Sequence, residues 1–335
     1  MKTQSDSPTT QLHFLSQIHQ AFCAERVTDL DCFRDDAVID CFHPLNEQIG
    51  REAFYESLIL PLQAAFGGLR RKVDIAMAGD WSPRGEAPQR WLSMTGHFVG
   101  QHRDSFLGLP ASHRLSALRF GEFYRLEHGV VTAAKLIWDL PGLFAQAGHP
   151  MFGPSNGREW LTPGPMSHDG VLRRDPTPEQ TAHSLQLVEA KIAGLMSYDG
   201  KTLESMGMER FWSKDMLWHG PWGIGSSSGL KGFQDVHQRP FLAAFPDRKG
   251  GHHSARFADG PYVCSTGWPS IRATQLGDYL GHPATGRSIT MRVMDWWRVE
   301  HGRLSENWVF IDLPHLFLQF GRDLLHEALE AGRSR

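Results

Sequence analysis

Residues 298–302, Arg-Val-Glu-His-Gly, repeat residues 125–129, Arg-Leu-Glu-His-Gly, at a distance of 173 positions along the chain. A second cluster of matches begins with Gly50 and Gly229 and keeps a distance of 179 positions. The further matches follow in the same order: Phe54 with Phe233, Pro61 with Pro240, Phe66 with Phe245, Asp80 with Asp259, Gly108 with Gly281, and Asp139-Leu140-Pro141 with Asp312-Leu313-Pro314. Two ordered clusters, each at a constant distance, indicate that one domain has been duplicated.

The change in distance from 179 to 173 positions locates an insertion, and composition locates the domain boundary. This change means that the first copy carries six extra residues, which we place in the polar stretch Trp81–Gln89. The segment His149–Pro178 is rich in glycine and proline and has no helical or strand period, which is typical of a linker. We therefore expect a first domain over residues 1–150, a linker over 151–177 and a second domain over 178–335.

Each copy is predicted to begin with helices and to end with strands. Apolar residues recur at helical spacing between Leu185 and Leu195. A further helix is expected to start near Gly50 in the first copy and near Gly229 in the second. The rest of each copy has the pattern of strands, with turns at glycine, proline and aspartate. Helices followed by antiparallel strands indicate an α+β fold, not a parallel doubly wound one.

The last hairpin is the clearest element of this pattern. Two β-prone runs, 288–299 and 304–313, flank His301-Gly302, which suits a tight two-residue turn. A turn centred there gives cross-strand partners whose residue numbers add to 603. Asp295 would then lie opposite Trp308.

Both faces of this hairpin are largely apolar. In this register, Asp312 shares one face with Trp308 and Phe310, and we expect that face to line the interior of the second copy. Trp296 lies on the other face, which we expect to pack on the sheet of the first copy. The two copies would then form a dimer within one chain, and homo-oligomers built on that pair stay open.

Several short motifs of the second copy follow one another in a recognisable order. They are Gly281-His282-Pro283-Ala284-Thr285-Gly286-Arg287, a strand with Asp295, the turn His301-Gly302-Arg303-Leu304, Glu306-Asn307-Trp308, Asp312 and Gln319-Phe320-Gly321. This order resembles the SnoaL-like polyketide cyclase family of the nuclear transport factor 2-like superfamily. The resemblance covers most of residues 178–322 and, more loosely, about residues 10–150.

The resemblance implies two tandem cone-shaped barrels, in each of which helices wrap a curved antiparallel sheet around a pocket. Enzymes of this family close a ring in an aromatic polyketide ester by an intramolecular aldol condensation, without a metal or an organic cofactor. Their closing aspartate acts as general acid and base, which places that role on Asp312 and, less directly, on Asp139. This sequence departs from the family at Asn307, where the motif has histidine, and at Lys135, where the first copy lacks the tryptophan.

The residues of the hairpin suit such chemistry. A lone carboxylate with a raised pKa can remove a proton beside a carbonyl group and later protonate the alkoxide. We expect burial beside Trp308 and Phe310 to raise the pKa of Asp312, so that Asp312→Asn abolishes turnover. The alternative is that Asp312 caps the backbone before Leu313-Pro314, and this alternative weighs more for Asp139.

The candidate substrate-binding residues surround this hairpin: His219, Trp222, Asp295, Trp308, Phe310, Arg287 and Glu122. His219 lies between two tryptophans that suit a planar ligand, or it is a buried structural histidine. Asp295 orients a substrate hydroxyl group or pairs with an arginine. Arg287 holds a carboxylate or an ester oxygen of the substrate, or it forms a surface ion pair. Because Lys135 would neutralise Glu122 across the first hairpin, we expect the second copy to be the more active one.

Composition excludes several classes of function. A net charge of −3 offers no basic excess for nucleic acid, and no apolar run is long enough to span a membrane. The polar stretch Met1–Thr10 lacks the apolar core of a secretion signal, so we expect a cytoplasmic protein. The four cysteines form no metal-type spacing and are expected to be reduced thiols, and we expect no metal and no cofactor.

These observations leave two functions open. The first is a cofactor-free enzyme, a cyclase or a related isomerase, dehydratase or hydrolase, that acts on a small hydrophobic carbonyl compound. The second is a protein of the same fold that binds a small hydrophobic ligand without catalysis. An aspartate with a raised pKa in a closed pocket would favour the enzyme. A pocket filled by its own aromatic rings, with Asp312 bonded to the backbone, would favour the binding protein.

Overall fold

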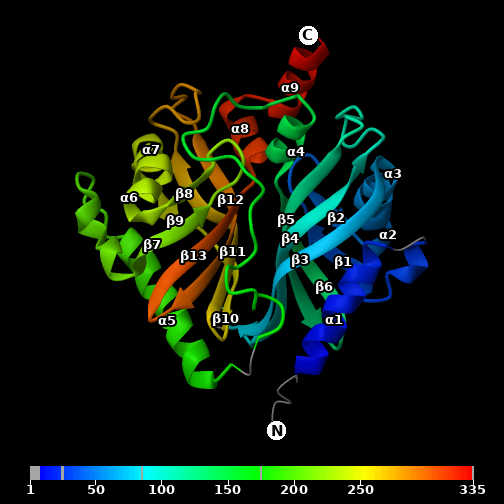
Figure 1. Cartoon of the computed structure of the whole chain (residues 1–335), viewed down its shortest axis with the longest axis horizontal. Coiled ribbons are helices and arrows are strands. Elements are labelled where there is room, and N and C mark those ends of the chain that lie inside the picture. Colours follow the sequence, from blue (N-terminus) through cyan, green and yellow to red (C-terminus); the bar gives the residue numbers. More distant parts are fainter. Residues whose placement is uncertain (1–7, 24–25, 84–85, 174–175, 334–335) are drawn as a thin grey trace.

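The computed structural model describes residues 8–23, 26–83, 86–173 and 176–333, which form two α+β units side by side (Figure 1). Part of the polar N-terminal stretch and two residues of the Trp81–Gln89 insertion lie outside the described residues. The expected α+β class and the duplication are confirmed, because the same elements follow one another in both units.

The first copy runs from an N-terminal helix to the short helix that follows its last strand. Its elements are α1 Pro8–Ala21, η1 Val27–Asp29, β1 Phe33–Asp40, β2 Glu47–Ile49, α2 Arg51–Phe54, η2 Tyr55–Ile59, α3 Leu60–Ala65, β3 Phe66–Trp81, β4 Gln89–His102, β5 Leu115–Glu127, β6 Val130–Trp138 and α4 Leu140–Gln146. The segments α2, η2 and α3 form one continuous helix with a π-helical centre.

The second copy repeats this order and ends with an additional helix. Its elements are α5 Pro178–Leu195, η3 Leu203–Met206, η4 Met208–Arg210, β7 Trp212–His219, β8 Ser226–Ser228, α6 Gly229–Phe233, η5 Gln234–Gln238, α7 Arg239–Ala244, β9 Lys249–Gly250, β10 His253–Asp259, β11 Tyr262–Thr274, β12 Ser288–Glu300, β13 Arg303–Ile311, α8 Leu313–Phe320 and α9 Leu324–Arg333. Thr177 caps α5, since its side chain accepts a hydrogen bond from the backbone N–H of Gln180.

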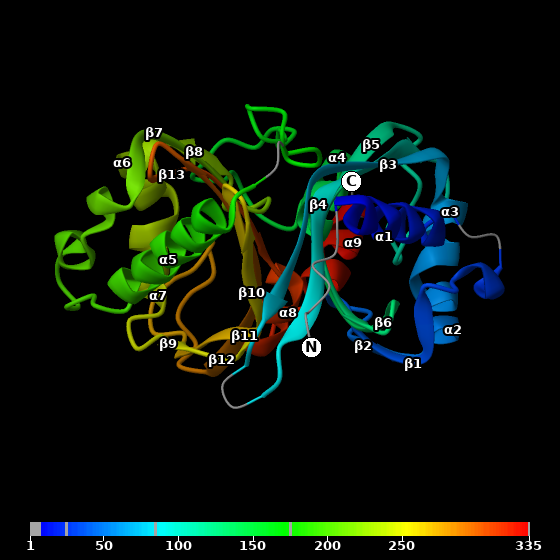
Figure 2. The same ribbon diagram turned by 90° about the horizontal axis from the view of Figure 1, so that it is seen from below.

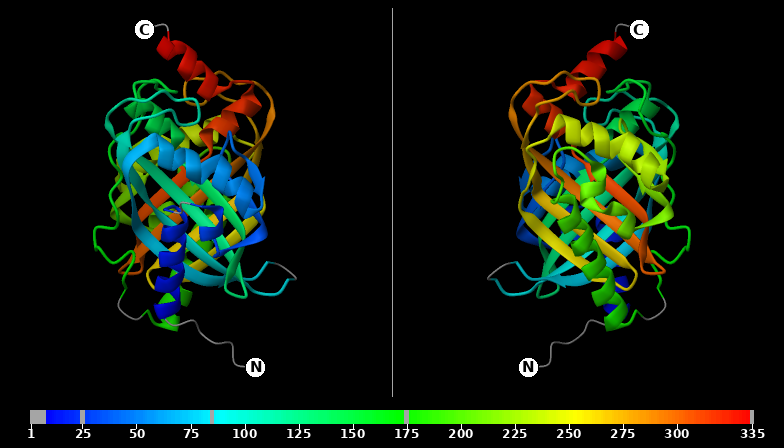
Figure 3. Two further views of the ribbon diagram at one scale, coloured as in Figure 1. Left: turned by 90° about the vertical axis from the view of Figure 1, so that its right-hand side faces the viewer. Right: turned by 90° about the vertical axis from the view of Figure 1, so that its left-hand side faces the viewer.

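Each sheet is antiparallel apart from one parallel pair. The strand order is β2-β1-β6-β5-β4-β3 in the first copy and β10-β11-β12-β13-β7-β8 in the second, where β9 also pairs with β11. The parallel pairs are β1 with β6 and β7 with β13. Helices cover the outer face of each sheet (Figure 3), so each copy encloses its own core between helices and sheet.

The predicted register of the last hairpin is wrong by one residue. From Trp297 to Val293 the partner numbers add to 604, because Ser305 is an extra residue between the pairs Val299–Leu304 and Arg298–Glu306. The first copy carries the same irregularity beside Arg125. Beyond such a β-bulge, each residue of the bulged strand lies on the opposite face from the one that a regular register would give it, since successive side chains of a strand point to opposite sides.

The inner faces of the two sheets pack on each other along the middle of the molecule (Figure 2). The buried residues of this interface come from both copies: Ile75, Met77, Trp91, Phe123, Ile137, Ala255, Phe257, Tyr262, Cys264, Met294, Trp296, Trp308 and Phe310. Gly121 permits a close approach, because a Cβ atom there would lie 2.9 Å from the Trp296 ring. Trp296 is fully buried, and the second apolar face of the hairpin lies against the sister sheet.

The linker and the last helix join the copies further. The carbonyl oxygen of Pro163 accepts a hydrogen bond from Nε1 of Trp308 at 2.9 Å, and Gly170 accepts one from Ala76 of the first copy. Helix α9 crosses from the second copy to the first, where Leu325 and Ala328 join the hydrophobic core. The linker is therefore part of the packed structure and not a spacer.

Candidate functional site

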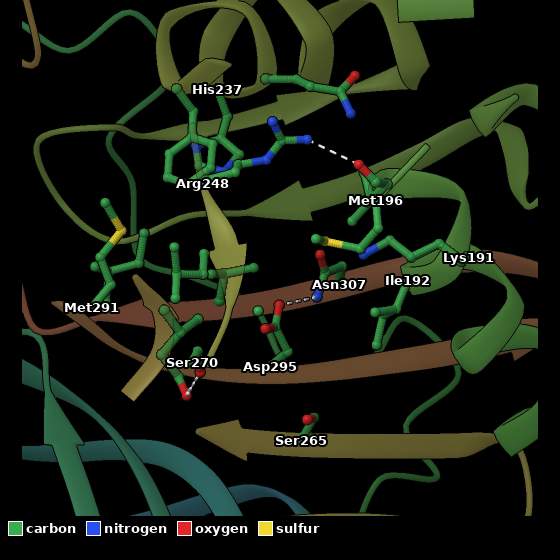
Figure 4. A pocket seen from close by; sticks show the side chains of 18 of the residues that line it. Lys191, Ile192, Met196, His237, Arg248, Ser265, Ser270, Met291, Asp295 and Asn307 are labelled. Carbon is green, nitrogen blue, oxygen red and sulfur yellow. Dashed lines mark hydrogen bonds between the residues drawn. The ribbon is translucent and has the colours of Figure 1, made fainter. Parts of the chain in front are cut away.

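A cavity of about 200 Å³ lies inside the second copy, between its helices and the outer face of its sheet. Its apolar wall includes Ile192, Leu195, Met196, Trp218, Phe233, Phe241, Leu242, Ile271, Met291, Val293, Trp297, Val309 and Ile311. The polar residues of the lining are Lys191, His237, Gln238, Arg248, Lys249, His253, Ser265, Ser270, Asp295 and Asn307. Figure 4 shows Asp295 from β12, Asn307 from β13 and Lys191 from α5, with His237 and Arg248 across the cavity. A cavity with a mainly apolar wall and some polar groups is the usual form of a small-molecule site.

Asp295 is the acidic group of this cavity. It lies on the cavity face of the sheet, where its cross-strand neighbours are Ser265 of β11 and, because of the bulge, Val309 of β13 in place of Trp308. Nδ2 of Asn307 approaches its Oδ1 at 3.4 Å, a long and therefore weak hydrogen bond. Burial raises the pKa of Asp295 to about 6, although the nearby charge of Lys191 lowers it. The pKa of this carboxyl group is thus close to neutral pH, which suits a group that both accepts and donates a proton.

Lys191 is the cation whose charge lowers the pKa of Asp295 most. Its side chain is 6% exposed and lies on the apolar face of α5, with Nζ 4.9 Å from the Trp297 ring centre and 5.4 Å from that of Trp212. Burial lowers the pKa of Lys191 to about 8, and the charge of Asp295 counteracts part of this effect. In the described part of the chain, no carboxylate lies within 4 Å of its amine.

A neutral histidine forms part of the opposite wall. His237 lies in the π-helical segment η5 and stacks on Trp218, with ring centres 4.7 Å apart. Burial lowers the pKa of His237 to about 3, and its Nδ1 has no hydrogen-bond partner. An unpartnered polar atom in an apolar wall is costly unless a ligand or a water molecule bonds to it.

The corresponding interior of the first copy is filled. Glu122 holds the position of Asp295, and it accepts hydrogen bonds from the guanidinium group of Arg71, from the Tyr124 hydroxyl at 2.7 Å and from Trp138 at 3.3 Å. Arg71 lies among the rings of Phe22, Phe98 and Phe120. Lys135 does not neutralise Glu122 as predicted, because the bulge turns it toward Asp40.

The second copy lacks the groups that fill the first. Arg71 pairs in register with Phe98, whereas at the equivalent place Gly250 pairs with Ile271. The strand residues on this face are also smaller, since Phe120 and Trp138 are replaced by Val293 and Ile311. The cavity therefore exists because an arginine and two aromatic side chains have been replaced by smaller residues.

Asp312 does not line this cavity, and its predicted placement is wrong. The bulge puts Trp308, Phe310 and Asp312 on the same face as Trp296, which is the interface between the copies. The carboxylate caps α8 through the backbone N–H of His315 at 3.2 Å, accepts the N–H of His43 in the first copy at 3.0 Å and pairs with Arg292 at 3.2 Å. Burial does raise the pKa of Asp312 to about 6, but its oxygens already have partners.

Asp139 repeats this arrangement with the copies exchanged. It caps α4 through the N–H of Gly142 at 3.3 Å and accepts the N–H of Trp222 in the second copy at 3.0 Å. Arg119 donates to the carbonyl groups of His219 and Gly220, as Arg292 donates to that of Cys41. A pocket of about 250 Å³ is lined by Asp139, Arg119 and Trp222, but these polar groups already bind backbone atoms.

The other predicted binding residues also belong to the interface or the surface. Trp308, Phe310 and His219 are buried between the copies, where His219 stacks on Trp308 with ring centres 5.6 Å apart. Burial lowers the pKa of His219 to about 3. Arg287 is exposed and donates to the carbonyl oxygen of Gln319 at 3.4 Å. Of the predicted site residues, only Asp295 lies in the cavity of the second copy.

Sequence reasoning did not select Lys191 and His237. The signal for Lys191 was present, because position 191 falls three residues after Val188 and four before Leu195, on the apolar face of α5. A lysine on such a face reaches into the core. Within the described residues, no group of three or more histidine, cysteine, aspartate or glutamate side chains could hold a metal ion. No helix in the described part of the chain is long and apolar enough to cross a membrane.

Residues 201–320 match the family model described as SnoaL-like polyketide cyclase. The match lies within the second copy, which contains the cavity. The second copy is therefore a SnoaL-like domain, and the chain carries two tandem domains of this architecture. A comparison with curated proteins found no match.

Solved structures of single domains cover less than half of the chain. IdmH from Streptomyces antibioticus, a proposed polyketide cyclase, is 25% identical over 41% of this chain and 99% of its own length, with a TM-score of 0.33. A proposed polyketide cyclase from Acidithiobacillus ferrooxidans is 21% identical over 42% of this chain and 96% of its own, with a TM-score of 0.35. A proposed SnoaL-like polyketide cyclase from Jannaschia is 14% identical over 44% and 99%, with a TM-score of 0.33.

Proposed function

We propose that the second copy is a cyclase-type enzyme that uses Asp295 as general acid and base on a small hydrophobic carbonyl compound. Asp295 removes a proton from the carbon beside the carbonyl group and then delivers it to the oxygen that gains charge. The observation that carries this proposal is a carboxyl group with a raised pKa on the wall of an open apolar cavity. The family match of residues 201–320 supports the same reaction class.

The first copy serves as a structural partner in this proposal. Its interior is occupied by Arg71 and aromatic rings, and its Glu122 is already bonded to three side chains. Its sheet buries the inner face of the second sheet, which would otherwise expose Trp296 and Phe310. This division of roles follows from one equivalent position in the two copies. Arg71 fills the interior of the first copy, whereas Gly250 leaves the cavity of the second copy open.

The test is proton exchange at an activated carbon. 2-Indanone, a small apolar ketone, is incubated with the full chain in D2O, and deuterium incorporation beside the carbonyl group is followed by NMR. We expect Asp295→Asn to lower the exchange rate by about a hundredfold, the size of a general-base contribution. Asp312→Asn is the matched control and is expected to keep exchange near the wild-type rate, because Asp312 lies outside the cavity.

The outcomes separate the two functions that the sequence left open. Exchange that depends on Asp295 supports the enzyme. Binding of 2-indanone with equal exchange in the wild type and in Asp295→Asn would contradict the proposal and favour a binding protein. Exchange lost in Asp312→Asn, with its fold intact by circular dichroism, would return the catalytic role to the interface aspartate.

A further inference from the structure

Lys191 is a buried amine that the proposed proton transfer does not use. It lines the same cavity as Asp295, and its side chain is 6% exposed. Most lysines reach solvent or pair with a carboxylate, because burying an unpaired ammonium group is costly. Here the amine faces the rings of Trp212 and Trp297, and the charge of Asp295 raises its pKa.

Such surroundings favour the neutral amine over the ammonium form. Burial lowers the pKa of Lys191 to about 8, so a substantial fraction is a nucleophile near neutral pH. The charge of Arg256 lowers it further, and that of Asp295 raises it. Asp295, with its own pKa of about 6, lines the same cavity from strand β12 as a proton donor and acceptor.

We propose that Lys191 forms an imine with an aldehyde or ketone bound in the cavity of the second copy, assisted by Asp295. The neutral amine nitrogen attacks the carbonyl carbon, and Asp295 carries one proton from this nitrogen to the carbonyl oxygen, which gives a carbinolamine. A protonated Asp295 then gives its proton to the hydroxyl group, which leaves as water while the C=N bond forms, and the nitrogen returns its remaining proton to Asp295. The amine and the carbonyl compound become an imine and one water molecule, without an oxidant or a reductant.

This inference deepens the proposed function and rests on the same cavity. It assigns the substrate class as a compound with an unhindered aldehyde or ketone group, since an ester carbonyl would not form a stable imine. An iminium group would also withdraw electrons from the neighbouring carbon and ease the proton removal by Asp295. Lys191 is then a catalytic residue that contacts the substrate.

The experiment is reductive trapping of the full chain with benzaldehyde and sodium cyanoborohydride, followed by peptide mass spectrometry. Benzaldehyde has no hydrogen on the carbon beside its carbonyl group, so trapping reports imine formation separately from proton removal. Lys249 is the internal control, because it borders the same cavity but is exposed. We expect labelling of Lys191 at least about tenfold faster than of Lys249, because the cavity holds the aldehyde beside the Lys191 amine.

Two variants make the result decisive. Lys191→Arg keeps the charge but cannot form the imine, so it should lose the adduct, whereas Lys249→Arg should keep it. Labelling of Lys191 no faster than that of Lys249 would overturn the imine. If Lys191 is not labelled while Asp295→Asn still lowers the exchange of 2-indanone, the imine fails and the proposed base stands. If Lys191 is labelled while exchange is independent of Asp295, the imine stands and the base fails.

Discussion

Asp295 and Glu122 hold the same position in the two copies, and their neighbours decide what each carboxyl group can do. Glu122 is bonded by Arg71, Tyr124 and Trp138, so it acts as part of a packed core. Asp295 has one weak hydrogen bond from Asn307 and a cavity beside it. A raised pKa does not by itself identify a reactive acid, since Asp312 has one as well.

The pH dependence of exchange follows from the pKa of Asp295. The base must be ionised, and burial raises its pKa to about 6, so exchange should fall about tenfold for each pH unit below 6 and level off above it. Because the charge of Lys191 lowers this pKa, Lys191→Met should move the acid limb to higher pH. A pH–rate profile of 2-indanone exchange measures both. A limb that stays at pH 4 would contradict the assignment to Asp295.

A single substitution should convert the second cavity into the state of the first. Gly250→Arg places a guanidinium group where Arg71 stands in the first copy, and a Cβ atom at Gly250 would meet no atom within 4 Å. We expect the long side chain to fill the cavity and to pair with Asp295, so binding of 2-indanone and exchange should drop by at least about tenfold. Fluorescence titration and NMR measure the two effects.

The control for this substitution is made at Gly153, which does not line the cavity of the second copy. Gly153→Arg adds the same side chain where a Cβ atom also meets nothing within 4 Å. It should bind and exchange like the wild type. Unchanged binding in Gly250→Arg would mean that the ligand occupies another site.

At the scale of elements, the last hairpin decides which face of the sheet each residue occupies. Its turn at His301-Gly302 follows from glycine and local pattern, and the strand bounds match the expectation closely. The extra residue Ser305 does not follow from the local pattern, and the register between β13 and the parallel strand β7 shifts at the same place. One residue of register moved Trp308, Phe310 and Asp312 to the opposite face, whereas Asp295 and Trp296 lie on the faces that were expected.

Deletion of Ser305 tests the importance of this bulge. Without the extra residue, Asn307, Val309 and Ile311 would turn toward the interface, so we expect the variant to lose cooperative unfolding or to unfold at a much lower temperature. Ser305→Ala keeps the bulge and removes only the bonds with Arg298, so it should cost about 1 kcal/mol. Calorimetry separates the two. Equal melting of the deletion and the wild type would contradict this reading.

At the scale of the whole molecule, the two copies pack on each other through one apolar interface, and an equivalent aspartate of each copy bonds across it. Asp139 and Asp312 each cap a helix of their own copy and bind a loop of the other. The duplication, the α+β class and the two apolar faces were predictable from sequence, because they rest on repeats and periodicity. The identity of the cavity residues was not, since it depends on register and on a missing arginine at Gly250.

The tight contact at Gly121 gives a measure of the interface. Gly121→Ala adds a methyl group within 2.9 Å of the Trp296 ring, so it should lower the free energy of unfolding by about 1–3 kcal/mol. Gly153→Ala meets open space and should change it by less than about 0.5 kcal/mol. Urea denaturation of both variants measures the difference. Equal stability would mean that the sheets are not packed so closely.

The central claim is that ligand chemistry takes place at Asp295 in the second copy. The most direct measurement is a crystal structure of the full chain with bound 2-indanone. We predict the ketone inside the cavity between α5 and the sheet, with its carbonyl group or neighbouring carbon within about 3.5 Å of Asp295 or Lys191. A ketone bound instead in the interface pocket beside Asp139 and Trp222, with the cavity of the second copy empty, would contradict the account.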